Sequence, residues 1–254
     1  MPRISVAGPS TFVTDAAAEI ASVGGSVVDV AIVASLTAMC SEPGVCAPGG
    51  GGFMTIDTPR QPPIVIDGYM AYPGLGFKGT PVQHEVTMEY GGGVTTAVGP
   101  ATIGVPGSFA ALETASEMFG VAPWKELMEV SASALEGGFP LSQASYDYLI
   151  HSGRLIFWDD PISRRAIFDG DRLKTVGESV VFEGLAATLR QIGSEGAAVL
   201  YRGELGRSLV ADLGSRGGTL TTEDLETYRP ILRTPLSLEM SGWTFWGNPP
   251  PAVG

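Results

Sequence analysis

Four consecutive glycines, Gly49 to Gly52, separate an apolar segment from Phe53 and Met54. A residue without Cβ accepts positive φ and lets another backbone or a ligand come very close. A run of four glycines between a buried helix and a strand is hard to explain as a surface linker. The run therefore predicts a crowded junction, structural in role and near a cleft.

The glycine run lacks the pattern of a phosphate-binding loop. A dinucleotide fingerprint lies between a strand and a following helix, and a P-loop continues into Lys-Ser or Lys-Thr. Here the predicted order is helix and then strand, and Phe53 follows the last glycine. We predict no cofactor for this chain.

The composition indicates a globular protein and excludes several partners. Of 254 residues, 44% are hydrophobic and only 17% are charged, with 35 glycines and 19 prolines. Such values favour an α/β or α+β fold with many tight turns. The net charge of −12 disfavours nucleic acid and anionic membranes as partners. A small molecule or peptide is the expected ligand, and residues 1–254 read as a single domain.

Neither the cysteines nor the N-terminus gives a localisation or metal signal. Cys40 and Cys46 are too few for a disulfide scaffold, and their spacing is not that of a zinc knuckle. Residues 1–5 contain no charged segment followed by an apolar one, so no signal peptide is visible. The apolar stretch 27–40 is too short to span a bilayer. We therefore expect a cytoplasmic protein without a metal site.

Helix and strand signals alternate along most of the chain. Thr14 begins a predicted helix that Gly24 ends, and Ser26 caps a second, buried helix that reaches about Cys40. Residues 53–56 and 64–66 are predicted strands joined by a proline-rich turn. Further helices are predicted over 108–119, 124–135, 143–151, 183–191, 204–213 and from 222, and further strands over 235–240 and 243–246.

Residues 73–104 are rich in glycine and weakly periodic. A segment of this length without regular structure is usually a functional loop or disordered. We expect its part from Gly74 to Gly99 to cover a substrate groove, opening and closing on glycine hinges. His84 lies in it and is a candidate substrate contact.

No catalytic constellation is visible in the sequence. His84 and His151 are far apart, and neither has a ligand-like partner four residues on. His151 is expected to close a helix, where it would face the helix dipole. The acidic pairs at 159–160 and 169–171 lie in turns and are explained by turn chemistry. We assign no catalytic residue.

Several segments, taken together and in order, resemble the γ-glutamyltransferase (γ-glutamyltranspeptidase) family of N-terminal-nucleophile hydrolases, in its large-subunit half. Residues 16–34 are similar to the family's opening helix pair, and residues 42–54 to its most recognisable stretch. The other similar segments lie at 104–107, 123–124, 137–140, 201–203, 217–225 and 249–254. In the last of these, Ala252 and Val253 stand where the family has two serines.

The resemblance implies an α+β fold, an αββα sandwich with two stacked sheets and helices outside. It also implies a precursor that cleaves itself before a threonine, which then acts as nucleophile with its own amino group as base. In the family that threonine belongs to a small subunit. The resemblance thus accounts for the missing constellation, and the chain looks truncated after the Pro-Pro-Pro motif.

One departure from the family concerns the substrate. The family motif Asp-x-Arg-x-x-x-Pro, whose arginine binds the glutamyl α-carboxylate, corresponds here to residues 67–73, with Tyr69 at the arginine position. A phenol cannot supply the bidentate, permanently charged fork that a carboxylate favours. We therefore expect a γ-glutamyltransferase-like amide hydrolase or acyltransferase whose acyl-side recognition is altered. The alternative is a non-catalytic scaffold or an inactive remnant.

Overall fold

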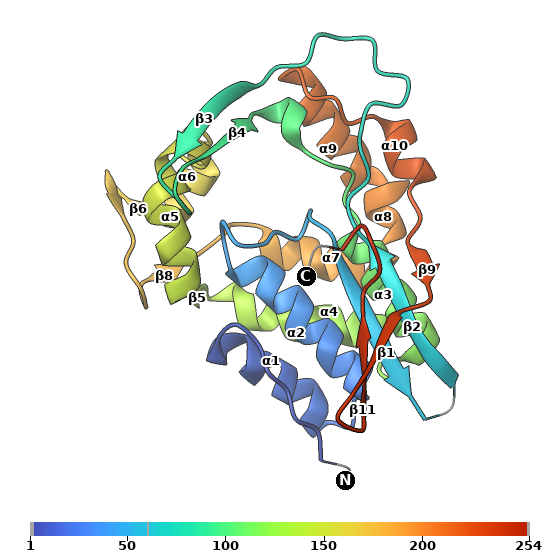
Figure 1. Ribbon diagram of the computed structural model, residues 1–254. Coiled ribbons are helices and arrows are strands. Elements are labelled where there is room, and N and C mark those ends of the chain that lie inside the picture. The colour runs from blue at the N-terminus through green and yellow to red at the C-terminus, as the bar shows by residue number, and fades with distance from the viewer. Residues whose placement is uncertain (1–2, 60, 253–254) are drawn as a thin grey trace.

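The computed structural model describes residues 3–59 and 61–252 (Figure 1). Parts of three predictions lie outside these ranges: the first two residues of the N-terminus, residue 60 of the proline-rich turn, and Val253 and Gly254 of the Pro-Pro-Pro motif. The chain begins with two helices, α1 (Thr11–Ser22) and α2 (Val27–Ser41), followed by the strands β1 (Gly52–Thr58) and β2 (Gln61–Gly68).

The start of α2 confirms the predicted cap at Ser26. The Asp29 N–H donates to the Ser26 hydroxyl at 3.1 Å, and the Ser26 N–H donates to the Asp29 carboxylate at 2.7 Å. This reciprocal capping box satisfies backbone donors that a helix start leaves open. The same buried carboxylate accepts from the N–H groups of Val121 and Ala122 at 3.0 and 3.2 Å. One acidic residue, the single charged residue of α2, therefore joins this helix to the connection between α3 (Ser108–Phe119) and α4 (Trp124–Glu136).

A three-stranded antiparallel sheet follows, in the order β1-β2-β9, with β9 covering Ile231–Arg233. The two predicted strands are confirmed, but both are longer than expected, since β2 begins at Gln61 within the predicted turn. Helix α3 (Ser108–Phe119) packs on one face of the sheet. A Cβ at Gly68 would lie only 2.3 Å from the Cβ of Ala111, so glycine permits this contact.

Most of the remaining chain is helical. The helices are α4 (Trp124–Glu136), α5 (Gln143–Ile156), α6 (Pro161–Ile167), α7 (Leu185–Glu195), α8 (Ala198–Tyr201), α9 (Glu204–Ser215) and α10 (Thr222–Thr227). Two pairs of two-residue strands lie among them, β5 (Phe139–Pro140) with β8 (Ser179–Val180) and β6 (Phe168–Asp169) with β7 (Arg172–Leu173). Because α5 continues past His151, the prediction that His151 closes a helix is wrong.

Apolar residues of α1, α2, α3, α4 and α7 form the core. In α3, Phe109 and Leu112 are buried, whereas Met118 is 43% exposed. The largest fully buried side chains include Ile20, Ile32, Leu36, Leu127, Met128, Leu189 and Ile192. None of the helices in the described part of the chain has the length and apolar character that a bilayer crossing requires.

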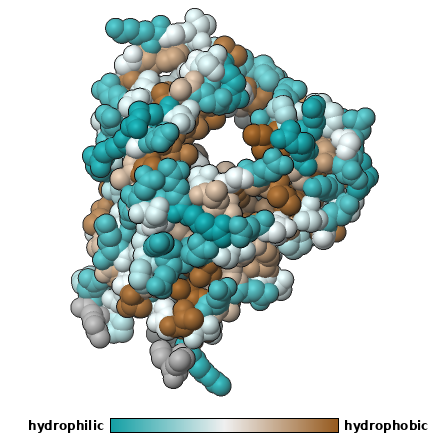
Figure 2. Space-filling view, turned by 180° about the vertical axis from the view of Figure 1, so that it is seen from behind, coloured by the Kyte–Doolittle hydropathy of each residue, from teal (hydrophilic) through white to brown (hydrophobic). Residues whose placement is uncertain are grey.

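Residues 73–104 form an arch, which contains a hairpin rather than only the predicted loop. Its strands are β3 (His84–Met88) and β4 (Val94–Val98), and a short 3-10 helix, η1 (Pro100–Thr102), follows. The arch extends from a position beside α9 and α10 to α5 (Figure 1). Figure 2 shows an opening through the molecule at this level.

The last regular element is the predicted hairpin, with β10 (Leu236–Met240) and β11 (Trp243–Gly247). All residues of both strands are exposed, and Trp243 exposes 71% of its surface. Asn248, directly after β11, accepts a hydrogen bond of 2.6 Å from the Thr55 hydroxyl of β1. The hairpin therefore presents an apolar, solvent-facing surface beside the sheet.

Candidate substrate-recognition site

Two members of the glycine run lie at a close backbone junction. A Cβ on Gly51 would lie 2.6 Å from both the Gly68 carbonyl oxygen and the Met70 nitrogen, and one on Gly50 would lie 2.9 Å from the Ala47 carbonyl oxygen. Gly49 and Gly52 have open space at the same position, and none of the four has a positive φ. Close approach, not a left-handed backbone, is therefore the physical reason for glycine at 50 and 51.

The junction also fixes the start of α3. The Gly50 carbonyl accepts hydrogen bonds from the N–H groups of Gly107 at 2.9 Å and Ser108 at 3.2 Å. A Cβ on Gly107 would lie 2.0 Å from the Gly68 carbonyl oxygen. The glycine run, the end of β2 and the start of α3 are thus held together through backbone atoms.

Tyr69 follows β2 at this junction. Its ring stacks on that of Phe53, with centroids 5.5 Å apart and planes 20° from parallel, and 45% of the residue is exposed. Its N–H donates to the Asp67 carboxylate at 2.9 Å, and its carbonyl accepts from the Tyr228 hydroxyl at 2.8 Å. A fixed backbone therefore presents a half-exposed aromatic ring next to the glycine run.

Arg233 is a member of this group that the sequence did not reveal. Its Nε donates to the buried Asp67 carboxylate at 2.6 Å from the neighbouring strand β9. A buried carboxylate at a strand end requires a hydrogen-bonded or charged partner. That rule predicts a partner for Asp67, but it does not select one among the chain's 15 basic residues.

His84 is placed elsewhere, on the arch. It is exposed at the first position of β3, opposite Val98 of β4. Within the described chain it neither stacks on Tyr69 nor shares a hydrogen bond with it. Over the same residues, His, Cys, Asp and Glu side chains form no group of three or more that could hold a metal ion.

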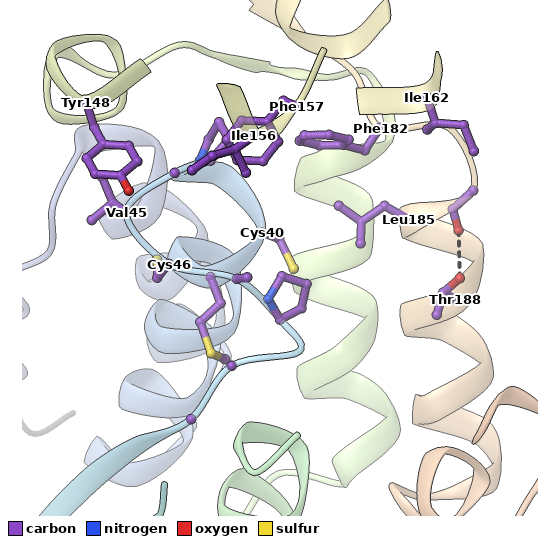
Figure 3. A pocket seen from close by; sticks show the side chains of 18 of the residues that line it. Cys40, Val45, Cys46, Tyr148, Ile156, Phe157, Ile162, Phe182, Leu185 and Thr188 are labelled. Atoms are coloured by element: carbon purple, nitrogen blue, oxygen red, sulfur yellow. Dashed lines mark hydrogen bonds between the residues drawn. The ribbon is translucent and has the colours of Figure 1, made fainter. Parts of the chain in front are cut away.

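A cavity of about 770 Å³ adjoins the glycine junction. Gly50, Gly51 and Met70 line it on the junction side, whereas Gly49, Gly52, Tyr69 and His84 are not among its lining residues. Figure 3 shows further lining side chains, with Cys40 from α2, Tyr148 and Ile156 from α5, and Leu185 and Thr188 from α7. The polar group around Tyr69 and this apolar cavity are thus neighbours across one backbone junction.

Comparisons with known proteins identify the family of this chain. The family model for gamma-glutamyltranspeptidase matches residues 13–254, so the chain belongs to the gamma-glutamyltranspeptidase family. Glutathione hydrolase 2 of Arabidopsis thaliana is 30% identical over 231 residues, which cover 91% of this chain and 38% of that protein. Glutathione hydrolase 5 proenzyme of Rattus norvegicus is 28% identical over 255 residues, which cover 99% of this chain and 43% of that protein.

Solved structures agree on the fold. The gamma-glutamyltranspeptidase from Pseudomonas nitroreducens complexed with L-DON superposes with a TM-score of 0.81 at 28% identity, covering 99% of this chain and 72% of that one. The cephalosporin acylase from Bacillus halodurans has a TM-score of 0.77 at 24% identity, with 98% and 48% covered, and is similar in fold alone.

The predicted fold class is therefore confirmed as α+β, of the N-terminal-nucleophile hydrolase type. Within the described residues the chain supplies the three-stranded sheet and the helices on one of its faces. It spans about two fifths of the length of the curated relatives named above, 38% and 43%.

Proposed function

We propose that this chain is the acyl-recognition part of a γ-glutamyltransferase-like amide hydrolase or acyltransferase. The nucleophile in this proposal is a threonine on a small-subunit segment outside these 254 residues. Self-cleavage frees its α-amino group, which takes the hydroxyl proton as the oxygen attacks the substrate amide. The amine leaves with a proton, an acyl-enzyme remains, and water or a second amine takes the acyl group.

Two observations support a further segment. Relatives of this chain carry the word proenzyme in their names, as glutathione hydrolase 5 of Rattus norvegicus does. The hairpin β10–β11 exposes Leu236, Leu238, Met240, Trp243 and Phe245 by half or more. An exposed apolar surface of this kind usually marks an interaction site. We propose that the small-subunit segment packs against it.

We further propose that recognition of the acyl side is altered, and Tyr69 carries this proposal. In this proposal the half-exposed Tyr69 ring, which stacks on Phe53, takes the place of the carboxylate-binding arginine in the family motif that residues 67–73 resemble. A phenol offers one hydrogen bond and an apolar face, and it has no permanent charge. We expect the acyl group to be bound by stacking on the Tyr69 ring and by a single hydrogen bond to its hydroxyl. We also propose that His84, which lies on the arch, contacts the substrate.

The test uses the complete, self-processed protein and γ-glutamyl-4-nitroanilide. Poor turnover by the native protein is expected, because Tyr69 does not bind the α-carboxylate tightly. Tyr69→Arg restores the charged fork and should raise kcat/KM by about tenfold or more, the effect of a charge-assisted hydrogen bond. Tyr72→Phe, at a residue that is 97% exposed, is the matched control. Efficient native turnover that Tyr69→Phe leaves undiminished would contradict altered recognition.

The alternative proposal is a non-catalytic scaffold or an inactive remnant. Intact-mass analysis and N-terminal sequencing of the purified protein distinguish it. A second chain that begins with threonine supports the enzyme. A single chain with no companion supports the remnant.

A further inference from the structure

The cavity beside the glycine junction has walls that are almost entirely apolar (Figure 3). The side chains that dominate it are those of Met39, Val45, Ile156, Phe157, Phe182 and Leu185. Its volume of about 770 Å³ lies in the range of small-molecule sites, which are mostly apolar with a few placed polar groups.

Buried polar contacts hold the wall at residues 42–47 in place. The Glu42 carboxylate is buried and accepts hydrogen bonds from the hydroxyls of Ser142 and Ser145, the latter at 2.9 Å. The Glu42 carbonyl accepts from the N–H groups of Val45 and Cys46, both at 3.1 Å. Glu42 therefore holds the first turn of this loop through both its side chain and its backbone carbonyl, which preserves the cavity's shape.

Gly44 completes this wall. It has a φ of +86°, and a Cβ there would lie 2.6 Å from the Tyr148 ring. Glycine therefore allows Tyr148 to lie directly on the loop. Tyr148 also meets the tip of the arch, since the Tyr90 ring lies 5.3 Å from its ring in an edge contact. The arch thus reaches the rim of the cavity.

The lining offers little to a charged ligand. Burial raises the pKa of the Cys40 thiol to about 12, and burial followed by the nearby Glu42 raises the pKa of the Cys46 thiol to about 11, so both are neutral at pH 7. Among the described lining residues only Glu183 is charged, and its carboxylate lies 3.8 Å from the Arg165 guanidinium. An anionic ligand would find no cationic side chain among the described residues of this lining.

The cavity adjoins the proposed recognition site at the glycine junction. Met70 lines it and is the next residue after Tyr69, while Gly51 lines it and touches the peptide that joins them. Val45 and Ile162 expose 54% and 51% of their surfaces on its walls. Covering such apolar surface is favourable.

We propose that this cavity binds an uncharged alkyl or aryl group of the substrate, with the scissile amide lying at the Tyr69 side of the glycine junction. This proposal rests on the proposed amide-hydrolase function and names its substrate class: amides that carry an apolar arm. The rest of the complete protein is the competing occupant.

A direct binding measurement tests the cavity. The complete self-processed protein is titrated with the neutral fluorophore N-phenyl-1-naphthylamine. We expect saturable binding that slows alkylation of Cys46, which lines the cavity. Ala47 is an exposed residue of the lining. Ala47→Leu should raise the Kd of the fluorophore about tenfold, which corresponds to a loss of about 1.4 kcal/mol in binding free energy. Ala211→Leu, exposed on α9, is the control and should change nothing.

A kinetic measurement connects the cavity to the substrate. KM is compared for hexanoyl-4-nitroanilide and acetyl-4-nitroanilide. Ala47→Leu should raise KM for the hexanoyl compound by about tenfold and leave that for the acetyl compound unchanged.

Two results would overturn the inference. Absence of saturable fluorophore binding would mean that other parts of the protein fill the cavity. Equal effects of Ala47→Leu on the two anilides would mean that the apolar arm lies elsewhere. Either result can occur while amide turnover persists, so the proposed function would survive. Saturable binding without turnover of any amide would reject the function and keep the cavity as a binding site.

Discussion

Asp67 and Arg233 lie on adjacent strands, and the Arg233 Nε donates to an Asp67 carboxylate oxygen at 2.6 Å. The other oxygen of the same carboxylate accepts from the Tyr69 N–H at 2.9 Å. Asp67 is buried and the Arg233 side chain is 31% exposed. This pair therefore attaches β9 to β2 and sets the backbone from which the Tyr69 ring projects.

Arg233→Gln should destabilise the protein, because it leaves the Asp67 carboxylate buried with one fewer charged partner. We expect a loss of about 2 kcal/mol in the free energy of unfolding, the range for hydrogen bonds to charged groups. Urea denaturation measures it, with Arg229→Gln on the exposed neighbouring segment as the control. Equal midpoints for the two variants would contradict a structural role for this pair.

Gly51→Ala and Gly52→Ala should differ sharply, although the two glycines are adjacent. The new methyl group at 51 would lie 2.6 Å from backbone atoms that cannot rotate away, whereas 52 has open space. Overpacking of this kind costs about 1–3 kcal/mol or more. Thermal unfolding of both variants measures the difference. A tolerated alanine at 51 would show that the junction can open.

The arch should loosen at acid pH through Asp224. Burial alone would raise its pKa. Hydrogen bonds from the N–H groups of Gly74, Leu75 and Thr221 outweigh this effect and hold the pKa below its ordinary value. A lowered folded pKa means that this stabilisation is present above about pH 4 and is lost as pH falls through the folded value.

Hydrogen exchange of residues 74–75, corrected for the intrinsic rate, checks this between about pH 6 and about pH 3. Protection should fall over that range in the native protein. Asp224→Asn should show low protection at neutral pH and little further change. Constant protection in the native protein would show that other contacts hold the base of the arch.

Cys46 should react slowly with alkylating agents despite its exposed position. Its pKa is raised to about 11 by partial burial of the thiol and then by the Glu42 carboxylate. At neutral pH its thiolate fraction is about two orders of magnitude below that of a free thiol. Iodoacetamide rates between about pH 7 and about pH 10 measure this, with N-acetylcysteine as reference. Cys40 should react only after unfolding, because it is buried. A Cys46 rate equal to the reference would contradict the raised pKa.

Local signals predicted those elements whose causes are local. Ser26 with Asp29, and Thr221 with Asp224, form capping boxes from residues three apart, so their helix starts were visible in the sequence. The hairpin in the arch was missed because its strands, at 84–88 and 94–98, carry few strongly apolar residues and lie between glycines. Helix α5 passes His151 because no breaker follows that residue before 156 except Gly153, which packs against Phe168.

The sequence by itself determined the family and the order of the main elements, since these depend on residue types and short spacings. Only the tertiary structure decided that Gly50 and Gly51, not Gly49 and Gly52, need to be glycine, because the atoms that crowd Gly51 come from the end of β2. It also decided that Arg233 is the partner of Asp67 and that an apolar cavity adjoins the glycine junction. Contacts between residues far apart in the sequence depend on how strands and helices pack, and no local sequence pattern specifies which of these residues meet.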